Sequence, residues 1–257
     1  MRVVDLGDGV LIHGSFTDKD VVSEVARIAG PLPLIIADPP YGNIVDDAWD
    51  RVETDDKQFV SWMLDWTWTC ARLSLPGAAL YVWGGIGRPG FRPFYRYLVD
   101  AEERTPYKLS NHITWSKKRA YGVSHNYLFC REELAYLVLG DDIKKPRMFN
   151  IPLLETKRGY AGYLAKYPAK SEFYRRTNVW MDITEIFRGK IHSTQKPDRL
   201  CEIPIEIHTS PGEWVLDPFA GSGTTGRAAR KLGRRFVLIE QDEAIFETCL
   251  KSLTKSV

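Results

Sequence analysis

The chain has 257 residues, of which 44% are hydrophobic, and its mean hydropathy is -0.27. This length predicts one large α/β domain with room for a smaller insert, and no apolar run is long enough for a membrane span. The formal net charge of +2 indicates no partner by itself. The first residues include acidic side chains and no apolar stretch, so we expect no secretory signal.

Helical and apolar patterns alternate in the first half of the chain. A helix is predicted over residues 18–29, where apolar side chains share one face, and a Gly-Pro pair ends it. A short apolar run at 34–37 is typical of a buried parallel strand. A second helix over 55–73 carries an aromatic stripe that we interpret as core packing, and a strand follows at 79–83.

The alternation continues to the end of the chain and predicts a doubly wound, mostly parallel α/β sheet. Residues 140–190 show no clear period, and we interpret them as an inserted module. The other predicted elements are a helix over 91–103, strands at 112–115 and 134–139 that form an antiparallel pair, a helix over 197–208, a strand at 214–217, a helix that ends near residue 232, a strand at 236–240 and a helix over 242–254.

Four cysteines lie far apart in the sequence, and no two of them have the short spacing of metal ligands. We therefore expect no metal site and no disulfide framework, but small buried side chains in a protein of the reducing cytoplasm. These residues are Cys70, Cys130, Cys201 and Cys249.

Basic residues gather in the segment 144–190. Eleven Lys and Arg stand there against four Asp and Glu, which gives the segment a net charge of +7. The rest of the chain is mildly acidic. Such a distribution favours a module that faces a polyanion, although a solvated surface loop can have the same composition.

A glycine-rich turn lies near the end of the chain. The segment Asp217–Gly226 contains the string Gly-x-Gly-x-x-Gly between a predicted strand and a predicted helix, where glycines let the backbone approach a ligand closely. Glu240 ends the next strand, the position at which Rossmann-like sheets bind ribose hydroxyls. The context indicates a nucleoside cofactor, but it does not choose between NAD and S-adenosylmethionine.

The tetrapeptide Asp38-Pro39-Pro40-Tyr41 follows a predicted buried strand, at the end where doubly wound sheets place their ligands. Asp38 and the main-chain carbonyl of Pro39 can each accept a hydrogen bond from one exocyclic amino group. The two prolines fix the direction of that carbonyl. The amino nitrogen then keeps a lone pair for attack on a sulfonium methyl, and Tyr41 can stack on the base. A base inside a duplex must first be flipped out.

These motifs together resemble the amino-group DNA methyltransferases. The order of Asp38–Tyr41 first and Asp217–Thr225 last is similar to the permuted beta group, as is the Thr194-Gln195-Lys196-Pro197 segment between them. The resemblance covers roughly residues 11–140 and 190–250. It implies transfer of a methyl group from S-adenosylmethionine to the N6 amino group of adenine in double-stranded DNA. Residues 141–190 fall where that group carries its target-recognition region.

The resemblance assigns roles to individual residues. Asp38, Pro39, Pro40 and Tyr41 take the catalytic role. Glu240 would hold the ribose, and Thr194 and Lys196 would face the carboxylate end of the cofactor. Ser15 stands where the family commonly has an Asp near the cofactor adenine. The whole cofactor set is Ser15, Asp38, Thr194, Lys196, Asp217, Phe219, Gly221, Ser222, Gly223, Thr224, Thr225 and Glu240.

The basic residues become candidates for DNA contact under this interpretation, because Lys and Arg neutralise phosphates and make affinity fall with salt. We also expect three regions: a catalytic half over 1–140, a target-recognition insert over 141–190 and a cofactor-binding half over 191–257. A homodimer and a separate restriction endonuclease are open as partners. The candidate DNA contacts are Lys117, Lys118, Arg119, Lys144, Lys145, Arg147, Arg175 and Arg176.

Other functions were weighed against this one. A cytosine carbon-5 methyltransferase needs a cysteine nucleophile, usually after proline, and no cysteine here follows a proline. Amino methylation of cytosine stays open, although such relatives more often have Ser where this chain has Asp38. An NAD-dependent dehydrogenase would explain the glycine-rich turn but leave Asp38–Tyr41 without a role. A DNA-binding subunit with a decayed active site does not agree with intact motifs.

Overall fold

The structure is a computed structural model of the chain that describes residues 1–41, 55–85, 91–122, 124–125, 127–157, 171–186 and 195–254. A nine-stranded sheet forms the centre of the described part. Its spatial order is β1 (Arg2–Asp5), β2 (Gly9–His13), β11 (Arg235–Glu240), β10 (Trp214–Asp217), β3 (Leu32–Ala37), β4 (Ser74–Gly84), β6 (Phe129–Leu139), β5 (Tyr107–Tyr121) and β9 (Val179–Trp180). A separate antiparallel pair consists of β7 (Leu153–Lys157) and β8 (Phe173–Arg175).

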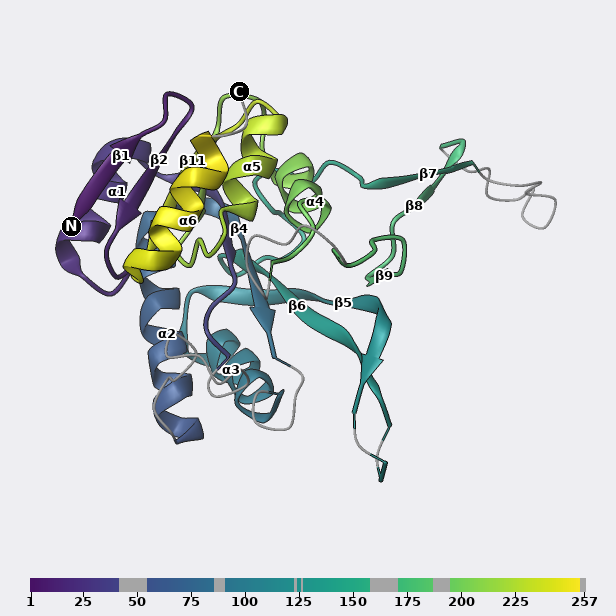
Figure 1. The fold of residues 1–257 in the computed structure, drawn as a ribbon. Helices are drawn as coiled ribbons and strands as arrows, with labels where there is room; N and C mark the ends of the chain where they lie inside the picture. The colour runs from purple at the N-terminus through teal and green to yellow at the C-terminus, as the bar shows by residue number, and fades with distance from the viewer. Residues whose placement is uncertain are drawn as a thin grey trace.

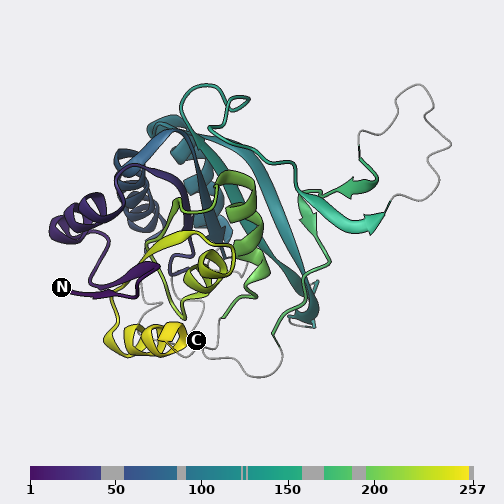
Figure 2. The same cartoon turned by 90° about the horizontal axis from the view of Figure 1, so that it is seen from above.

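The five strands from β2 to β4 in this order run parallel, whereas β1 is antiparallel to β2, and β6 is antiparallel to both β4 and β5. The short strand β9 is parallel to β5. Helices cover both faces, and Figure 2 shows the sheet between them. This arrangement confirms the predicted doubly wound fold. The helices are α1 (Lys19–Ala29), α2 (Asp56–Leu73) and α3 (Phe91–Arg104) on one face, and α4 (Arg199–His208), α5 (Thr224–Lys231) and α6 (Glu243–Thr254) on the other.

Two apolar cores form because successive side chains of a strand point to opposite faces of the sheet. In β3, Ile35 packs in the core that includes α1, α2 and α3, whereas Leu34 and Ile36 pack with α4, α5 and α6. Both faces of the parallel strands are therefore buried from solvent. This explains why β3 is a continuous apolar run rather than an alternating one.

The parallel pairing of β3 and β10 positions the functional site. Val215 lies opposite Leu34, and Leu216 lies opposite Ile35. Because the two strands are parallel, their carboxyl ends reach the same edge of the sheet. The segments that follow them, beginning at Asp38 and Asp217, consequently lie side by side.

The described part of the region without a predicted period contains three short strands. β7 and β8 extend away from the body of the molecule (Figure 1). β9 instead joins the main sheet, where Val179 and Trp180 lie opposite Thr114 and Trp115 of β5. Strands of two to five residues are too short to show a period in the sequence. β1 was missed for the same reason, and β5 is much longer than predicted.

No helix in the described ranges combines the length and apolar character that crossing a bilayer requires. The described side chains also contain no group of three or more His, Cys, Asp or Glu that could hold a metal ion.

His208 attaches the segment after β6 to the core. Its ring is almost completely buried at the end of α4; Nε2 lies 3.0 Å from the Tyr81 hydroxyl, and Nδ1 lies 2.8 Å from the Met148 carbonyl. Burial lowers the pKa of His208 to about 4, because the charged ring would lose its hydration. The folded protein therefore holds this imidazole neutral at neutral pH.

We expect His208 to make stability depend on pH. The unfolded chain protonates this ring below its ordinary pKa of about 6.5, whereas the folded protein does not until about pH 4. Stability is therefore complete above pH 6.5 and falls by up to about 3 kcal/mol between pH 6.5 and 4. Urea unfolding of the wild type and His208→Gln across this range measures the effect. Equal pH slopes in both proteins would contradict it.

Candidate active site

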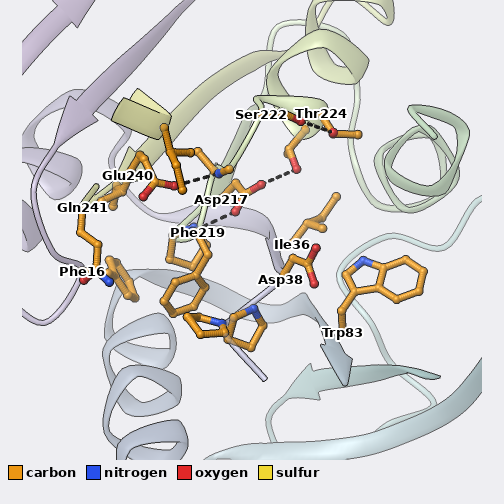
Figure 3. Close-up of a pocket in the computed structure, with 18 of the residues that line it drawn as sticks. Phe16, Ile36, Asp38, Trp83, Asp217, Phe219, Ser222, Thr224, Glu240 and Gln241 are labelled. Carbon is orange, nitrogen blue, oxygen red and sulfur yellow. Dashed lines mark hydrogen bonds between the residues drawn. The ribbon is translucent and has the colours of Figure 1, made fainter. Parts of the chain in front are cut away.

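A cavity opens at the edge of the sheet where β2, β3, β10 and β11 end (Figure 3). Its walls come from segments that are far apart in the sequence: residues 14–17 after β2, 38–41 after β3, 217–222 from the end of β10 onward and 240–241 at the end of β11. Side chains of α2 and residues 195–196 before α4 also line it. The sheet thus brings both predicted motifs to one cavity.

The turn after β10 is organised around the Asp217 carboxylate. One oxygen accepts a hydrogen bond from the Phe219 N–H at 2.9 Å, and the other accepts one from the Thr225 hydroxyl at 2.5 Å. Gly223 precedes α5 with φ +81°, a conformation that residues with a Cβ rarely adopt. Burial raises the pKa of Asp217 to about 7, although both hydrogen bonds oppose this shift.

Glu240 connects the turn after β10 with the end of β11. One carboxylate oxygen accepts the Gly221 N–H at 3.0 Å, and the other accepts the Asp242 N–H at 2.9 Å. Burial raises its pKa above the usual range. Each oxygen of a carboxylate has two acceptor sites, so Glu240 can still bind hydroxyl groups of a ligand.

The tetrapeptide after β3 lies on the other side of the cavity. Tyr41 donates its hydroxyl to Asp38 Oδ1 at 2.7 Å. Lys196 Nζ donates to Asp38 Oδ2 and, at 3.0 Å, to the Tyr41 hydroxyl oxygen. The segment before α4 thereby contacts the tetrapeptide directly.

Aromatic side chains form the apolar part of the wall. The Phe219 ring lies 5.4 Å from Trp66 and 5.8 Å from Trp62, measured between ring centroids. Both tryptophans belong to α2 and line the cavity. Our interpretation of the aromatic stripe as core packing is correct for the buried Trp66 ring, but it missed the second role of these residues in the site.

The structure brings nearly all predicted catalytic and cofactor residues together. The tetrapeptide and ten of the other eleven cofactor candidates can be located, and nine of these ten line the cavity; Gly223 instead shapes the turn. Thr194 lies outside the described residues. Sequence reasoning missed further lining residues, because these types are ordinary in cores and loops: Phe16, Thr17, Trp62, Trp66, Trp83, Gln195, Cys201, Gln241 and Ile245.

The charges in the cavity favour a cationic ligand. Among the described lining residues, the carboxylates are Asp38, Asp217 and Glu240, and the one side-chain cation is Lys196. A pyrophosphate would add two negative charges to this surrounding. A sulfonium or ammonium group would instead be attracted.

The candidate DNA contacts do not form one group. Arg176 is bound by Asp182 through two hydrogen bonds of 2.7 Å, and only 6% of its side chain is exposed. Arg147 pairs with Glu213 and Lys117 with Glu132, so these cations also have partners within the protein. The remaining candidates all have exposed side chains, and one of them, Lys145, also pairs with Asp142 at 3.2 Å. They are Lys118, Arg119, Lys144, Lys145 and Arg175.

Relatives of known activity agree with this site. The chain is 28% identical over 263 aligned residues to the DNA adenine methyltransferase YhdJ of Escherichia coli (strain K12). This alignment covers 95% of this chain and 82% of the relative. It is 27% identical over 238 residues to the type II methyltransferase M2.DpnII of Streptococcus pneumoniae, covering 86% and 82%. A crystal structure of the M1.HpyAVI complex with S-adenosylmethionine superposes with a TM-score of 0.65 at 26% identity, covering 95% and 98%.

The family model for DNA methylases of the N6 and N4 amino type matches residues 32–251. The chain belongs to this family. The match includes both the tetrapeptide and the glycine-rich turn. This DNA methylase therefore carries its family's motifs at one edge of one sheet, as the resemblance implied.

Thr225 tests how the Asp217 turn is held. We expect Thr225→Val to lower the free energy of unfolding by about 1–3 kcal/mol, because a buried carboxylate loses a hydrogen bond. The loss should be larger at pH 8 than at pH 6, since removal of the donor penalises the ionised form of Asp217, which prevails above pH 7.

Thr224→Val is the matched control for Thr225→Val, because the Thr224 hydroxyl contacts Ser222 and Arg227 rather than Asp217. Urea unfolding at both pH values measures the losses. A pH-independent loss in Thr225→Val, or the same pH dependence in the control, would contradict the assignment.

Proposed function

We propose that this DNA methylase transfers a methyl group from S-adenosylmethionine to the N6 amino group of adenine in a flipped-out base of double-stranded DNA. The observation that carries this proposal is the shared cavity of Asp38–Tyr41 and Asp217–Thr225. A nucleoside cofactor held by one loop can there face an amine held by the other. The two loops come from neighbouring parallel strands, so their separation is fixed by the sheet.

The described residues fit S-adenosylmethionine chemically. When bound, this cofactor supplies an electrophilic methyl group on a positively charged sulfur. Glu240 would accept hydrogen bonds from its ribose, and Phe219 with Trp62 offers an apolar wall for its base. Among the described lining residues three carboxylates stand against one lysine, which favours the cationic groups, and burial holds the pKa of Asp217 near 7. We infer that Ser15, Ser222 and the neighbouring threonines contribute further polar contacts.

The tetrapeptide would hold the target amine. Asp38 and the Pro39 carbonyl accept its two N–H bonds, so the lone pair of the nitrogen points away from both acceptors and towards the methyl group. Tyr41 keeps Asp38 oriented through its hydroxyl while its ring is available to the base. The nitrogen would accept the methyl group that the cofactor supplies, and the proton that the nitrogen loses would pass along its hydrogen bond to the Asp38 carboxylate.

Two observations favour adenine over cytosine as the target. Asp stands at position 38, where cytosine-specific relatives more often have Ser, and YhdJ is named a DNA adenine methyltransferase. Amino methylation of cytosine is the second candidate because the family includes both types.

An NAD-dependent dehydrogenase is disfavoured, since three carboxylates would repel a pyrophosphate and the tetrapeptide would have no role.

The organisation of the chain follows from this function. Residues 1–140 would form the catalytic half, 191–257 the cofactor-binding half and 141–190 the target-recognition insert. β2 extends the cofactor edge, because it pairs with β11 beside Glu240.

The DNA substrate and four free cysteines favour a cytoplasmic location. A homodimer and a cognate restriction endonuclease that acts separately are the partners that this function allows.

Replacement of Asp38 tests the catalytic assignment. We expect Asp38→Asn to lower the rate of methyl transfer to DNA by about 10²–10⁴-fold, because the variant loses the acceptor charge at the amine. The assay follows tritium transfer to unmethylated DNA, and hydrolysis to nucleosides identifies the product. Asp142→Asn, which changes an exposed carboxylate after β6, is the matched control. Full activity of Asp38→Asn, or a product of N4-methylcytosine, would refute the respective assignment.

The two neighbouring arginines of the insert should behave differently. Arg175 is exposed on β8, so we expect Arg175→Gln to weaken DNA binding and to reduce its salt dependence by about one phosphate contact. Arg176→Gln should mainly lower thermal stability, because it leaves Asp182 without its partner. Fluorescence anisotropy of labelled DNA at several salt concentrations, with melting curves, separates the effects. Equal loss of DNA affinity in both variants would contradict this division.

A further inference from the structure

Four charged side chains of alternating sign are connected by ion pairs that begin at Asp38 in the cavity. These residues are Lys117, Glu132, Lys196 and Asp38. They come from β5, from β6, from the segment before α4 and from the end of β3. Lys117 pairs with Glu132 Oε1, Lys196 Nζ lies 3.4 Å from Glu132 Oε2, and Lys196 pairs with Asp38. Only 9% of the Lys196 side chain and 16% of the Glu132 side chain are exposed.

The Lys196 ammonium forms ion pairs with two carboxylates, but the two contacts differ. It donates hydrogen bonds to Asp38 and to the Tyr41 hydroxyl. Its contact with the buried Glu132 Oε2, at 3.4 Å, is an ion pair without hydrogen-bond geometry, and this oxygen accepts no hydrogen bond from the described residues. A buried carboxylate oxygen without a hydrogen bond is costly. A small movement of the ammonium would satisfy Glu132 Oε2 at the expense of Asp38.

Such a movement would favour the proposed reaction. Asp38 must accept a hydrogen bond from the target amine, and an oxygen already paired with an ammonium accepts more weakly. Release of Asp38 by Lys196 would strengthen this acceptor, but it must not leave an unpaired buried charge, a state that proteins avoid because of its desolvation cost. Glu132 is the neighbouring carboxylate that can receive it.

We propose that Glu132 is a positioning residue of the methyl transfer, which takes the Lys196 ammonium from Asp38 when the target amine binds. This inference rests on the proposed function. In the free protein Lys196 neutralises Asp38. In the complex with DNA, the amine takes the Asp38 oxygen and the ammonium bonds to Glu132 Oε2.

The surroundings of Lys196 suit both positions. The Trp83 ring lies 4.8 Å from Nζ, so a cation–π contact can persist during the movement. Lys117 fixes Glu132 from the other side. Burial disfavours ionisation of Lys196, but Asp38 and Glu132 outweigh this effect and raise its pKa, so the ammonium stays charged.

Replacement of Glu132 by Gln removes the receiving charge and keeps the shape. We expect Glu132→Gln to lower kcat for DNA methylation by about 10–100-fold, the loss typical when a partner behind a functional side chain is removed. The affinity for S-adenosylhomocysteine, measured by calorimetry, should change little. Glu133→Gln is the matched control: Glu133 is the next residue of β6, is also buried, and bonds to Thr114 and His112 outside the cavity. Its kcat should stay close to that of the wild type.

Two further variants separate positioning from folding. Glu132→Asp retains the charge and should keep more of kcat than Glu132→Gln, with melting temperatures recorded for all proteins. In a Lys196→Met background, Glu132→Gln should cost little more, because its effect acts through Lys196.

The outcomes decide between the two proposals. A wild type that transfers no methyl group would defeat the proposed function. An active wild type would overturn only the role of Glu132 in any of four cases: Glu132→Gln keeps full kcat, loses cofactor affinity instead, loses no more than Glu133→Gln, or adds its full loss to that of Lys196→Met.

Discussion

The site depends on the parallel pairing of β3 with β10. This pairing brings the carboxyl ends of the two strands to one edge, with Asp38 after one strand and Asp217 at the end of the other. The tetrapeptide comes early in the chain and the glycine-rich turn comes late, so no local interaction could place them together. Helices pack against both faces of these strands and hold them in this register. A methyl group moves only when donor and acceptor are held in line, and the sheet supplies that constraint.

Electrostatics then determine what the cavity can hold. Asp217 and Glu240 are bound by backbone N–H groups or a hydroxyl, so their orientation is fixed before any ligand arrives. Asp38 differs from them, because its partners are the side chains of Tyr41 and Lys196 rather than backbone groups. The cofactor side of the cavity is thus preorganised, whereas the catalytic side has contacts that can be exchanged. This difference agrees with a cofactor site that forms first and an amine that arrives from a flipped base.

The sequence predicted the fold and motifs well where the signal is local. The apolar run of β3, the strand and glycine turn at Asp217–Gly226 and the final acid at Glu240 all lie as predicted. The contribution of Trp62 and Trp66 could not be predicted, because aromatic residues at helical spacing also fit a core. Glu132 could not be predicted for another reason: its proposed role depends on a contact with Lys196, 64 residues away in the chain. Such a contact follows from the packing of the segment before α4 against β6, which the local sequence pattern does not define.

The basic insert shows the limit of composition. Its net charge indicates a polyanion partner, but the same count includes Arg176, which stabilises the fold through Asp182, and Arg175, which is exposed. Charge counts do not separate surface cations from those with internal partners. Strands as short as β7, β8 and β9 leave no period either, so the shape of the insert came only from the structure.

A crystal structure of the protein with S-adenosylhomocysteine tests the central claim most directly. We predict that the ribose hydroxyls bind Glu240, that the adenine lies against the aromatic wall at Phe219, and that the sulfur faces Asp38 across the cavity. A ligand bound at another edge of the sheet, or bound in this cavity with its sulfur directed away from Asp38, would contradict the account.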